Sequence, residues 1–334
     1  MSAKQVRITS GVPAEVLALA CYSLGYRPTD SLVLVGVRPD HTCAAMRADL
    51  RGRNQLLPVL GATIPFLRRE QASDVIALLF TPTDPPLDDV DQRWIEAAGT
   101  ALSECHLRVA DLVWVGPTRY RSMRCTRPDC CPPAGLPVAE ALTDTLVAAT
   151  EVADGATCAP TLEDLIADTQ PRDVLDAGTL AVTDPGDPHA WLGDWATWIA
   201  HPDRTDWARA VAGINRTRHR DAVMAIAMAP GLDPATAIEA PEAIARDVLA
   251  RRPDPDHVQT TTGLLAATAS RAPAGWRAQP LAAAAFLAWD LGHGPRARLL
   301  TSVALADDPT NNLARLVRRV LAATIPPRWA ANTP

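Results

Sequence analysis

The segments Ser31-Leu-Val-Leu-Val-Gly-Val37 and Asp74-Val-Ile-Ala-Leu-Leu-Phe80 determine the fold class of this chain. Both are rich in aliphatic and β-branched residues, and neither alternates regularly between apolar and polar positions. Such runs are typical of strands that lie in the middle of a sheet and are covered on both faces. The sequence therefore predicts a sheet with two buried faces in the first part of the chain.

The neighbouring segments extend this sheet into an α/β domain. Pro13 suits the first turn of a helix, and Gly25 is a typical helix stop. The strand, helix and strand between residues 74 and 115 predict a right-handed parallel crossover. We therefore predict a mixed sheet. Besides the two buried runs, the expected strands are residues 5–10, 43–50 and 109–115, and the expected helices are residues 13–24, 54–71 and 88–106.

The second part of the chain has the periodicity of helices. From about residue 138 every periodic stretch indicates a helix, with breaks rich in proline between them. We therefore predict an α/β domain of residues 1–135, which ends in a cysteine-rich loop, and an all-α domain of residues 136–334.

Two patterns characterise the predicted helical domain. Trp191, Trp195 and Trp198 form one stripe of a helix, which indicates core, with a ligand-stacking surface as the alternative. Residues 280–322 place Ala285, Ala297, Ala304 and Pro309 at the separations of a tetratricopeptide repeat. Only one copy is visible, whereas an array needs about three, so we expect one capped, tetratricopeptide-like final hairpin.

The loop Arg119-Tyr-Arg-Ser-Met-Arg-Cys125-Thr-Arg127-Pro-Asp-Cys130-Cys131 contains three of the seven cysteines. Cys125, Cys130 and Cys131 could bind zinc, and the fourth ligand would then be Cys105, His106 or Cys158. Adjacent cysteines usually point in different directions, however, and structural zinc sites favour paired C-x2-C or C-x4-C segments. We therefore expect inert thiols in a rigid loop, with no metal and no other cofactor.

Charged residues at the predicted strand ends indicate a candidate ligand site. Ligands of α/β sheets gather beyond the carboxyl ends of parallel strands, and we expect Arg38, Asp84 and Arg119 to line any such crevice. Arg119 and Arg121 lie two residues apart, so both guanidinium groups would face the same side and suit a phosphate or carboxylate. The alternative is an edge strand that is protected by charge. His219 has basic neighbours, which favours a solvated helix face over a phosphate site.

Composition and missing motifs exclude several classes of protein. The net charge of −6 makes nucleic acid an unlikely partner, and Lys4 is the only lysine, as expected of a GC-rich genome. No leader-like segment and no run of 18 apolar residues is present, so we expect a soluble, cytoplasmic protein without membrane contacts. The chain lacks the phosphate-loop, dinucleotide-binding, zinc-protease and serine-hydrolase motifs.

Four segments together carry a resemblance to a known family. The pattern C-x4-C-C-P-P-x-G runs from Cys125 to Gly135, and the resemblance extends to residues 10–33, 220–221 and 285–309. These segments resemble the uncharacterised actinobacterial domain of unknown function family numbered 4192. Tyr120 departs from that pattern, because the family is expected to favour Trp there. The resemblance implies no catalytic residue, since the family has no assigned activity.

Two hypotheses of function follow from these patterns. In the first, the chain is a non-enzymatic interaction or adaptor protein whose helical half and arginine-rich loop bind a protein partner. In the second, it is an enzyme or a sensor that binds a small anionic ligand at the sheet crevice beside the cysteines. The missing catalytic motifs favour the first hypothesis.

Overall fold

The computed structural model of the chain forms two compact units, residues 1–162 and 163–334. The strand predicted at residues 5–10 lies outside the residues that the structure describes. Among the described helices, none is long and apolar enough to span a lipid bilayer. The described residues are 12–38, 42–50, 56–69, 71–104, 108–153, 156–229, 231–239, 249–323 and 325–331.

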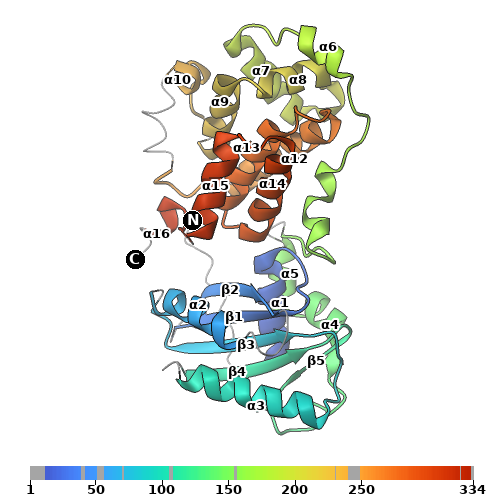
Figure 1. Cartoon of the computed structure of the whole chain (residues 1–334), viewed down its shortest axis with the longest axis vertical. Coiled ribbons are helices and arrows are strands. Elements are labelled where there is room, and N and C mark those ends of the chain that lie inside the picture. Colours follow the sequence, from blue (N-terminus) through green and yellow to red (C-terminus); the bar gives the residue numbers. More distant parts are fainter. Residues whose placement is uncertain are drawn as a thin grey trace. The chain divides into compact units, whose positions relative to one another are not determined.

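The first unit is the α/β unit (Figure 1). The helix that begins with Pro13 ends at Gly25, which has the left-handed conformation expected of a helix stop. The elements in chain order are α1 (Pro13–Leu24), β1 (Ser31–Val37), β2 (Thr42–Asp49), α2 (Leu56–Arg69), β3 (Asp74–Phe80), α3 (Asp89–Glu104), β4 (Arg108–Val115), β5 (Arg119–Ser122), β6 (Leu136–Pro137), α4 (Val138–Thr143) and α5 (Leu146–Ala153).

A mixed sheet of six strands, in the order β2-β1-β3-β4-β5-β6, forms the centre of this unit. The crossover through α3 makes β3 and β4 parallel, as predicted. All other neighbours are antiparallel, including the central pair β1 and β3, in which Ser31 is opposite Phe80 and Val37 is opposite Asp74. The carboxyl end of β1 therefore lies at the opposite edge of the sheet from the carboxyl ends of β3 and β4.

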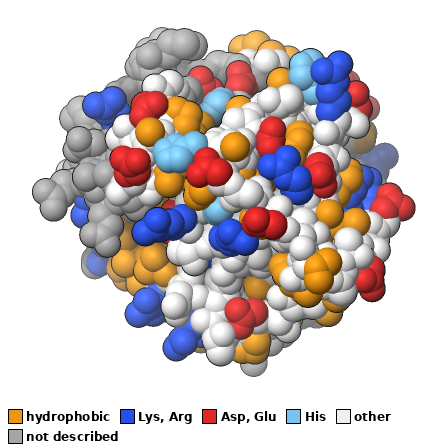
Figure 2. Space-filling model, turned by 90° about the horizontal axis from the view of Figure 1, so that it is seen from above, with side chains coloured by type: hydrophobic (Ala, Val, Ile, Leu, Met, Phe, Trp, Pro, Cys, Tyr) orange, Lys and Arg blue, Asp and Glu red, His pale blue; other side chains and the backbone are white. Residues whose placement is uncertain are grey.

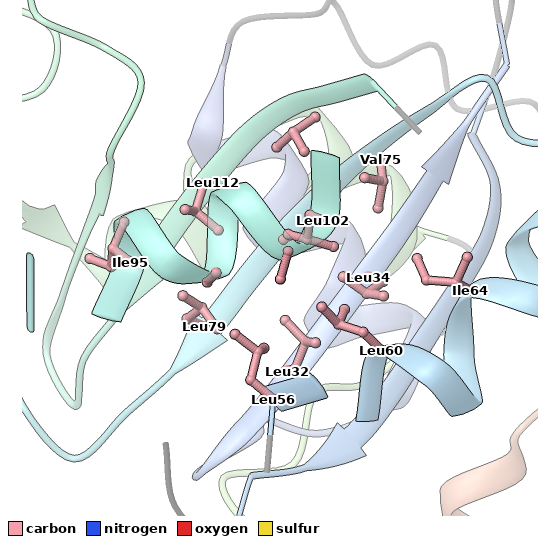
Figure 3. Close-up of a cluster of buried hydrophobic side chains, with 14 of the residues drawn as sticks. Leu32, Leu34, Leu56, Leu60, Ile64, Val75, Leu79, Ile95, Leu102 and Leu112 are labelled. Carbon is pink, nitrogen blue, oxygen red and sulfur yellow. The ribbon is translucent and has the colours of Figure 1, made fainter. Parts of the chain in front are cut away.

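Helices α2 and α3 cover one face of the sheet. Leu32 and Leu34 of β1 and Leu79 of β3 pack there against Leu60 of α2 and Leu102 of α3, all at most 2% exposed (Figure 3). The intervening strand residues are buried as well, and α1 covers the opposite face (Figure 1). Burial on both sides explains why these strands are continuous apolar runs.

Helices α4 and α5, which follow the cysteine loop, pack with α1 in the first unit. The carboxylate of Glu15 accepts hydrogen bonds from the backbone N–H groups of Leu146 and Val147, and the Tyr22 hydroxyl donates to the Leu142 carbonyl oxygen. The first compact unit consequently extends to residue 162, beyond the predicted domain end at residue 135.

The second unit is helical, and none of its described residues belongs to a strand. Trp191, Trp195 and Trp198 are at most 4% exposed and contact one another, so the tryptophan stripe is core, as predicted. The elements are η2 (Glu163–Thr169), α6 (Ala177–Val182), α7 (Pro188–Ala200), η3 (Pro202–Arg204), α8 (Trp207–Ile214), α9 (Thr217–Met228), α10 (Pro234–Glu239), α12 (Pro255–Arg271), α13 (Ala278–Asp290), α14 (Gly294–Asp307), α15 (Asn312–Ala322) and α16 (Arg328–Ala331).

The last three long helices pack through small side chains. Ala285 of α13 and both Ala297 and Ala304 of α14 are completely buried where α13, α14 and α15 contact one another. Alanine at these positions lets the helix backbones approach closely, which is the role expected of small residues in a tetratricopeptide-like hairpin. One side of α15 is left exposed, with Arg315 and Leu316 on it.

Candidate functional site

The predicted ligand residues do not all meet at one edge of the sheet. Arg38 follows Val37, which pairs with the first residue of β3, whereas Asp84 and Arg119 follow the carboxyl ends of β3 and β4. The antiparallel pairing of β1 and β3 is the reason for this separation. Any single crevice at the strand ends would therefore contain Asp84 and Arg119 but not Arg38.

Asp84 holds together the corner where β4 turns into β5. Its carboxylate accepts hydrogen bonds from the Thr118 backbone N–H at 2.9 Å, the Thr118 hydroxyl at 2.6 Å and the Arg119 backbone N–H at 2.8 Å. Burial by itself would raise the pKa of Asp84, but these hydrogen bonds outweigh it and lower the pKa below its usual value. Asp84 therefore acts as a structural acceptor in this corner.

Two glycines make the same corner tight. A Cβ atom on Gly116 would lie 2.6 Å from the Asp84 Cα atom, so no larger residue fits without movement. Gly135 has a φ of +72°, and a Cβ atom there would lie 2.9 Å from the Tyr120 carbonyl oxygen. The Arg27 guanidinium donates to the carbonyl oxygens of Gly116 and Pro117. The loop after β3, the turn between β4 and β5, and the segment after α1 are therefore joined by the hydrogen bonds of Asp84 and Arg27.

The arginines of the cysteine loop largely serve the fold. The Arg119 guanidinium donates to the Gly135 carbonyl oxygen at 2.8 Å, and the Arg124 guanidinium donates to the Val109 carbonyl oxygen. Arg119 and Arg121 lie on the same face of β5, as their spacing predicts, but Arg121 is opposite the buried Trp114, and its Nε atom is buried without a partner. The Arg119 guanidinium is thus already bonded within the protein, and part of the Arg121 guanidinium is buried.

A set of short hydrogen bonds folds the cysteine loop back on itself. The Ser122 hydroxyl donates to the Asp111 carboxylate at 2.7 Å and accepts from the backbone N–H groups of Arg124 and Cys125. Further on, the Arg127 carbonyl oxygen accepts from the backbone N–H groups of both Cys130 and Cys131, at 3.2 and 2.8 Å. These bonds form two local turns in the loop and attach its first turn to β4.

The three thiols of the loop converge. The Sγ atoms of Cys125, Cys130 and Cys131 all lie within 4.8 Å of one another, and those of the adjacent pair are 3.9 Å apart. The expectation that Cys130 and Cys131 point in different directions is therefore wrong, because both backbone N–H groups bond to the same carbonyl and curl the chain around it. Cys131 is buried, Cys125 is partly exposed and Cys130 is exposed, so only Cys131 of the three thiols is buried.

None of the fourth ligands considered for zinc is seen in this cluster. Cys105 and His106 lie outside the described residues. Cys158 is instead paired with Cys21 of α1, and the hydrogen bond between these two thiols raises the pKa of Cys21 and lowers that of Cys158. The described part of the chain thus contains a cluster of three thiols and a separate pair.

The surroundings of His219 differ from those predicted. His219 is 3% exposed and packs edge-on against Trp191, with ring centroids 4.8 Å apart. The prediction of a solvated face is wrong, because only Arg216 and Arg218 of the basic neighbours point to solvent. Arg220 pairs with Asp221 and donates to Gln279 of α13. Burial, followed by the nearby Arg216 charge, lowers the pKa of His219.

The exposed side of α15 carries a group of arginines with a hollow between them. Arg315, Leu316, Arg318 and Arg319, together with Asn312, line a hollow of about 430 Å³, and all five side chains are exposed. Among the described residues, none of these arginines has an ion-pair or side-chain hydrogen-bond partner. No sequence motif marks this face, although the i, i+3 and i+4 spacing of its arginines is the signal that could indicate it.

Other surfaces of the molecule differ from this face. One face, seen in Figure 2, mixes acidic and basic side chains, with small hydrophobic groups between them. A second hollow, of about 410 Å³, lies between α6, α8 and the segment that precedes α13, but its polar side chains are already bonded. There Arg216 pairs with Asp184, and the Asn215 amide donates to the carbonyl oxygens of Val211 and Trp276.

Comparison with known proteins gives one result. The family model described as "Domain of unknown function (DUF4192)" matches residues 13–328, which is nearly the whole chain and includes the cysteine loop, the tryptophan stripe and α15. No curated protein and no solved structure matches the chain.

Proposed function

The chain belongs to the DUF4192 family, for which no activity is described, and we propose from its own surface that it is a non-enzymatic interaction protein. Its helical unit binds an acidic segment of a protein partner on the exposed side of α15. The segment supplies carboxylates to Arg315, Arg318 and Arg319 and a bulky apolar side chain to the hollow beside Leu316. The observation that carries this proposal is the group of three arginines around that hollow, none of which has an ion-pair partner among the described residues.

The charge on this face supports an acidic occupant. Arg315 and Arg319 are four residues apart and Arg318 lies between them, so three like charges share one helical face and destabilise α15 by about 0.2–0.5 kcal/mol per pair. The helix dipole compensates Arg319 in the last turn, but it does not favour Arg315 in the first half of α15. A partner with carboxylates would relieve this repulsion and would form bidentate hydrogen bonds with the guanidinium groups.

The shape of the face supports a peptide more than a small metabolite. Leu316 is 43% exposed, and the aliphatic stems of its arginine neighbours enlarge this apolar surface. The hollow is open and lies on a single helix, whereas small-molecule sites are usually enclosed clefts. An extended or helical segment can place one side chain in the hollow and several carboxylates around it.

The alternative hypothesis, a small anionic ligand at the sheet edge, has less support. It depends on Arg119 and Arg121, and Arg119 donates its guanidinium hydrogen bond to Gly135 within the protein. The cytoplasm remains the compartment that we propose, because the described cysteines 21, 125, 130, 131 and 158 are all free and a reducing environment keeps thiols in that state.

The test is a binding measurement with defined peptides. The probe is a fluorescent peptide with three glutamates around a central leucine, and its comparison peptide carries glutamine in place of glutamate. We expect fluorescence anisotropy to show that the full chain binds the glutamate peptide, less strongly at high salt, and that the glutamine peptide binds at least tenfold more weakly. Three exposed pairs of up to about 1 kcal/mol each allow for a difference of this size.

Charge reversal with a matched control localises the binding to α15. The variant Arg315→Glu, Arg318→Glu, Arg319→Glu should lose the glutamate peptide. The control reverses Arg204, Arg218 and Arg251, three exposed arginines elsewhere in the helical unit, and changes the net charge equally. If both variants lose the peptide to the same extent, or if neither does, α15 is not the binding site.

A further inference from the structure

The three thiols of the cysteine loop lie nearly as close together as the ligands of a tetrahedral metal site. Zinc binds thiolate sulfur at about 2.3 Å, so two sulfur atoms on the same ion lie about 3.8 Å apart. The Sγ atoms of Cys130 and Cys131 are 3.9 Å apart, and Cys125 completes a triangle with no side longer than 4.8 Å. The Cys130–Cys131 separation is thus that of two ligands on one zinc ion, and the Cys125 Sγ atom lies within 4.8 Å of both.

Two backbone N–H groups point at sulfur atoms of this triangle. The Arg127 N–H donates to the Cys125 Sγ atom, and the Ser122 N–H donates to the Cys131 Sγ atom. Both bonds favour the thiolate over the thiol, because a thiolate is much the better acceptor. The loop thus provides outer hydrogen bonds that orient sulfur ligands, as metal sites require.

The free thiols differ in their readiness to ionise. The Arg127 N–H, followed by the neighbouring thiols, lowers the pKa of Cys125. Burial, followed by hydrogen bonds with the other two thiols, raises the pKa of Cys131 to about 12. A metal ion that binds to these thiols would displace their protons, as metal binding to cysteine requires.

Hydrogen bonds rather than an apolar core hold this loop in place. Its residues 126–130 are all exposed, and Cys131 is the only buried residue between Ser122 and Gly135. An apolar core therefore cannot account for the convergence of the thiols. The positive charges of Arg124 and Arg127 lie next to Cys125 in the chain and would offset the net negative charge of three thiolates on a divalent ion.

We propose that Cys125, Cys130 and Cys131 bind one Zn²⁺ ion as thiolates, with the fourth coordination position open on the side of the exposed Cys130. Each ligand releases its proton to solvent as its Zn–S bond forms, so three protons leave for each ion bound. Water or a side chain from another molecule takes the fourth position, as in zinc sites that keep one exchangeable ligand. The site ties the two ends of the loop together beside β5 and β6 of the α/β unit.

The experiment uses the full chain, purified under reducing conditions, incubated with Zn²⁺ and separated from unbound metal by gel filtration. We expect elemental analysis to find one zinc per chain, and Co²⁺ in its place to give the intense charge-transfer absorption of cobalt thiolates. Zinc affinity should fall as the pH is lowered, because protons compete for the same sulfur atoms. A chain that retains no zinc and shows no cobalt–thiolate band would overturn the proposal.

Serine variants locate the ion within the chain. Cys130→Ser changes an exposed residue, so far-UV circular dichroism should show an unchanged fold. Zinc affinity should nevertheless fall by more than about tenfold, which is the loss already seen when outer hydrogen-bond partners of metal ligands are removed. The control Cys158→Ser removes a thiol outside the cluster and should leave zinc binding unchanged. Equal zinc content in wild type and Cys130→Ser would show that the ion is bound elsewhere.

Discussion

The burial of Asp290 leads to a prediction about how the stability of the folded protein depends on pH. This residue ends α13, is 1% exposed, and its Oδ1 atom has no hydrogen-bond partner among the described residues. Burial raises its pKa from 3.8 to about 7. The carboxylate also lies at the negative end of the α13 dipole, which disfavours its charge. Above the unfolded value the unfolded chain is ionised while the folded protein binds a proton, so stability falls as the pH rises from about 4 to 7.

The magnitude follows from the difference between the two pKa values. A difference of about 3 pH units, at about 1.4 kcal/mol per unit, corresponds to about 4 kcal/mol once the pH is above 7. The neutral variant Asp290→Asn has no such cost, so its advantage over wild type should grow by about 2–3 kcal/mol between pH 5 and pH 8. Asp203→Asn, at an exposed position of η3, is the control and should show no such growth.

Urea denaturation followed by far-UV circular dichroism at several pH values measures this effect. The useful quantity is the difference in unfolding free energy between variant and wild type, because other titrating groups cancel in it. If that difference is the same at pH 5 and pH 8, Asp290 ionises normally in the folded protein and the reasoning from its burial is refuted.

Three further predictions concern contacts within the two units, and the same denaturation assay checks each. Gly213→Ala should destabilise the helical unit by about 1–3 kcal/mol, because the added Cβ atom would overlap the Trp191 ring, whereas Gly193→Ala has open space and should be neutral or stabilising. His219→Phe should lose less stability than wild type between pH 7 and pH 5, because burial lowers the pKa of His219 and the unfolded chain binds the proton first. Asp84→Ala should cost about 2 kcal/mol near neutral pH. Wild type should lose this contribution below the unfolded pKa of 3.8, as the pH falls through the lowered pKa of the carboxyl.

The elements of the fold could be predicted from the sequence, but their pairing could not. Residues 31–37 and 74–80 are strands because both faces of the sheet are buried, and continuous apolar runs show this directly. Such runs are equally compatible with parallel and antiparallel neighbours, since their side chains do not differ between faces. The antiparallel pairing of β1 and β3 could therefore not be predicted from the sequence. This pairing places Arg38 at the opposite end of the strands from Asp84 and Arg119.

The geometry of the candidate sites could not be predicted from the sequence, for a different reason. Side-chain types at Cys130 and His219 could be interpreted, but their directions depend on contacts that are distant in sequence or on the path of a loop. The shared bonds to the Arg127 carbonyl turn Cys130 toward Cys125, and Trp191 buries His219 on the face of α9 that points inward. Basic neighbours in the sequence therefore indicate that a side chain is exposed to solvent only when the helix face on which it lies is known.

The arginines near β5 and those on α15 differ in what they contact. Arg119 and Arg124 donate to backbone carbonyl oxygens, where a guanidinium holds loop ends that have no regular secondary structure. Arg315 and Arg318 face solvent on a helix that needs no such support, because α15 already packs against α13 and α14. A charge that does nothing for the fold and repels its neighbours is the one most easily explained by a partner. For this reason we locate recognition on α15, although the density of cysteine and arginine in the sequence is highest near β5.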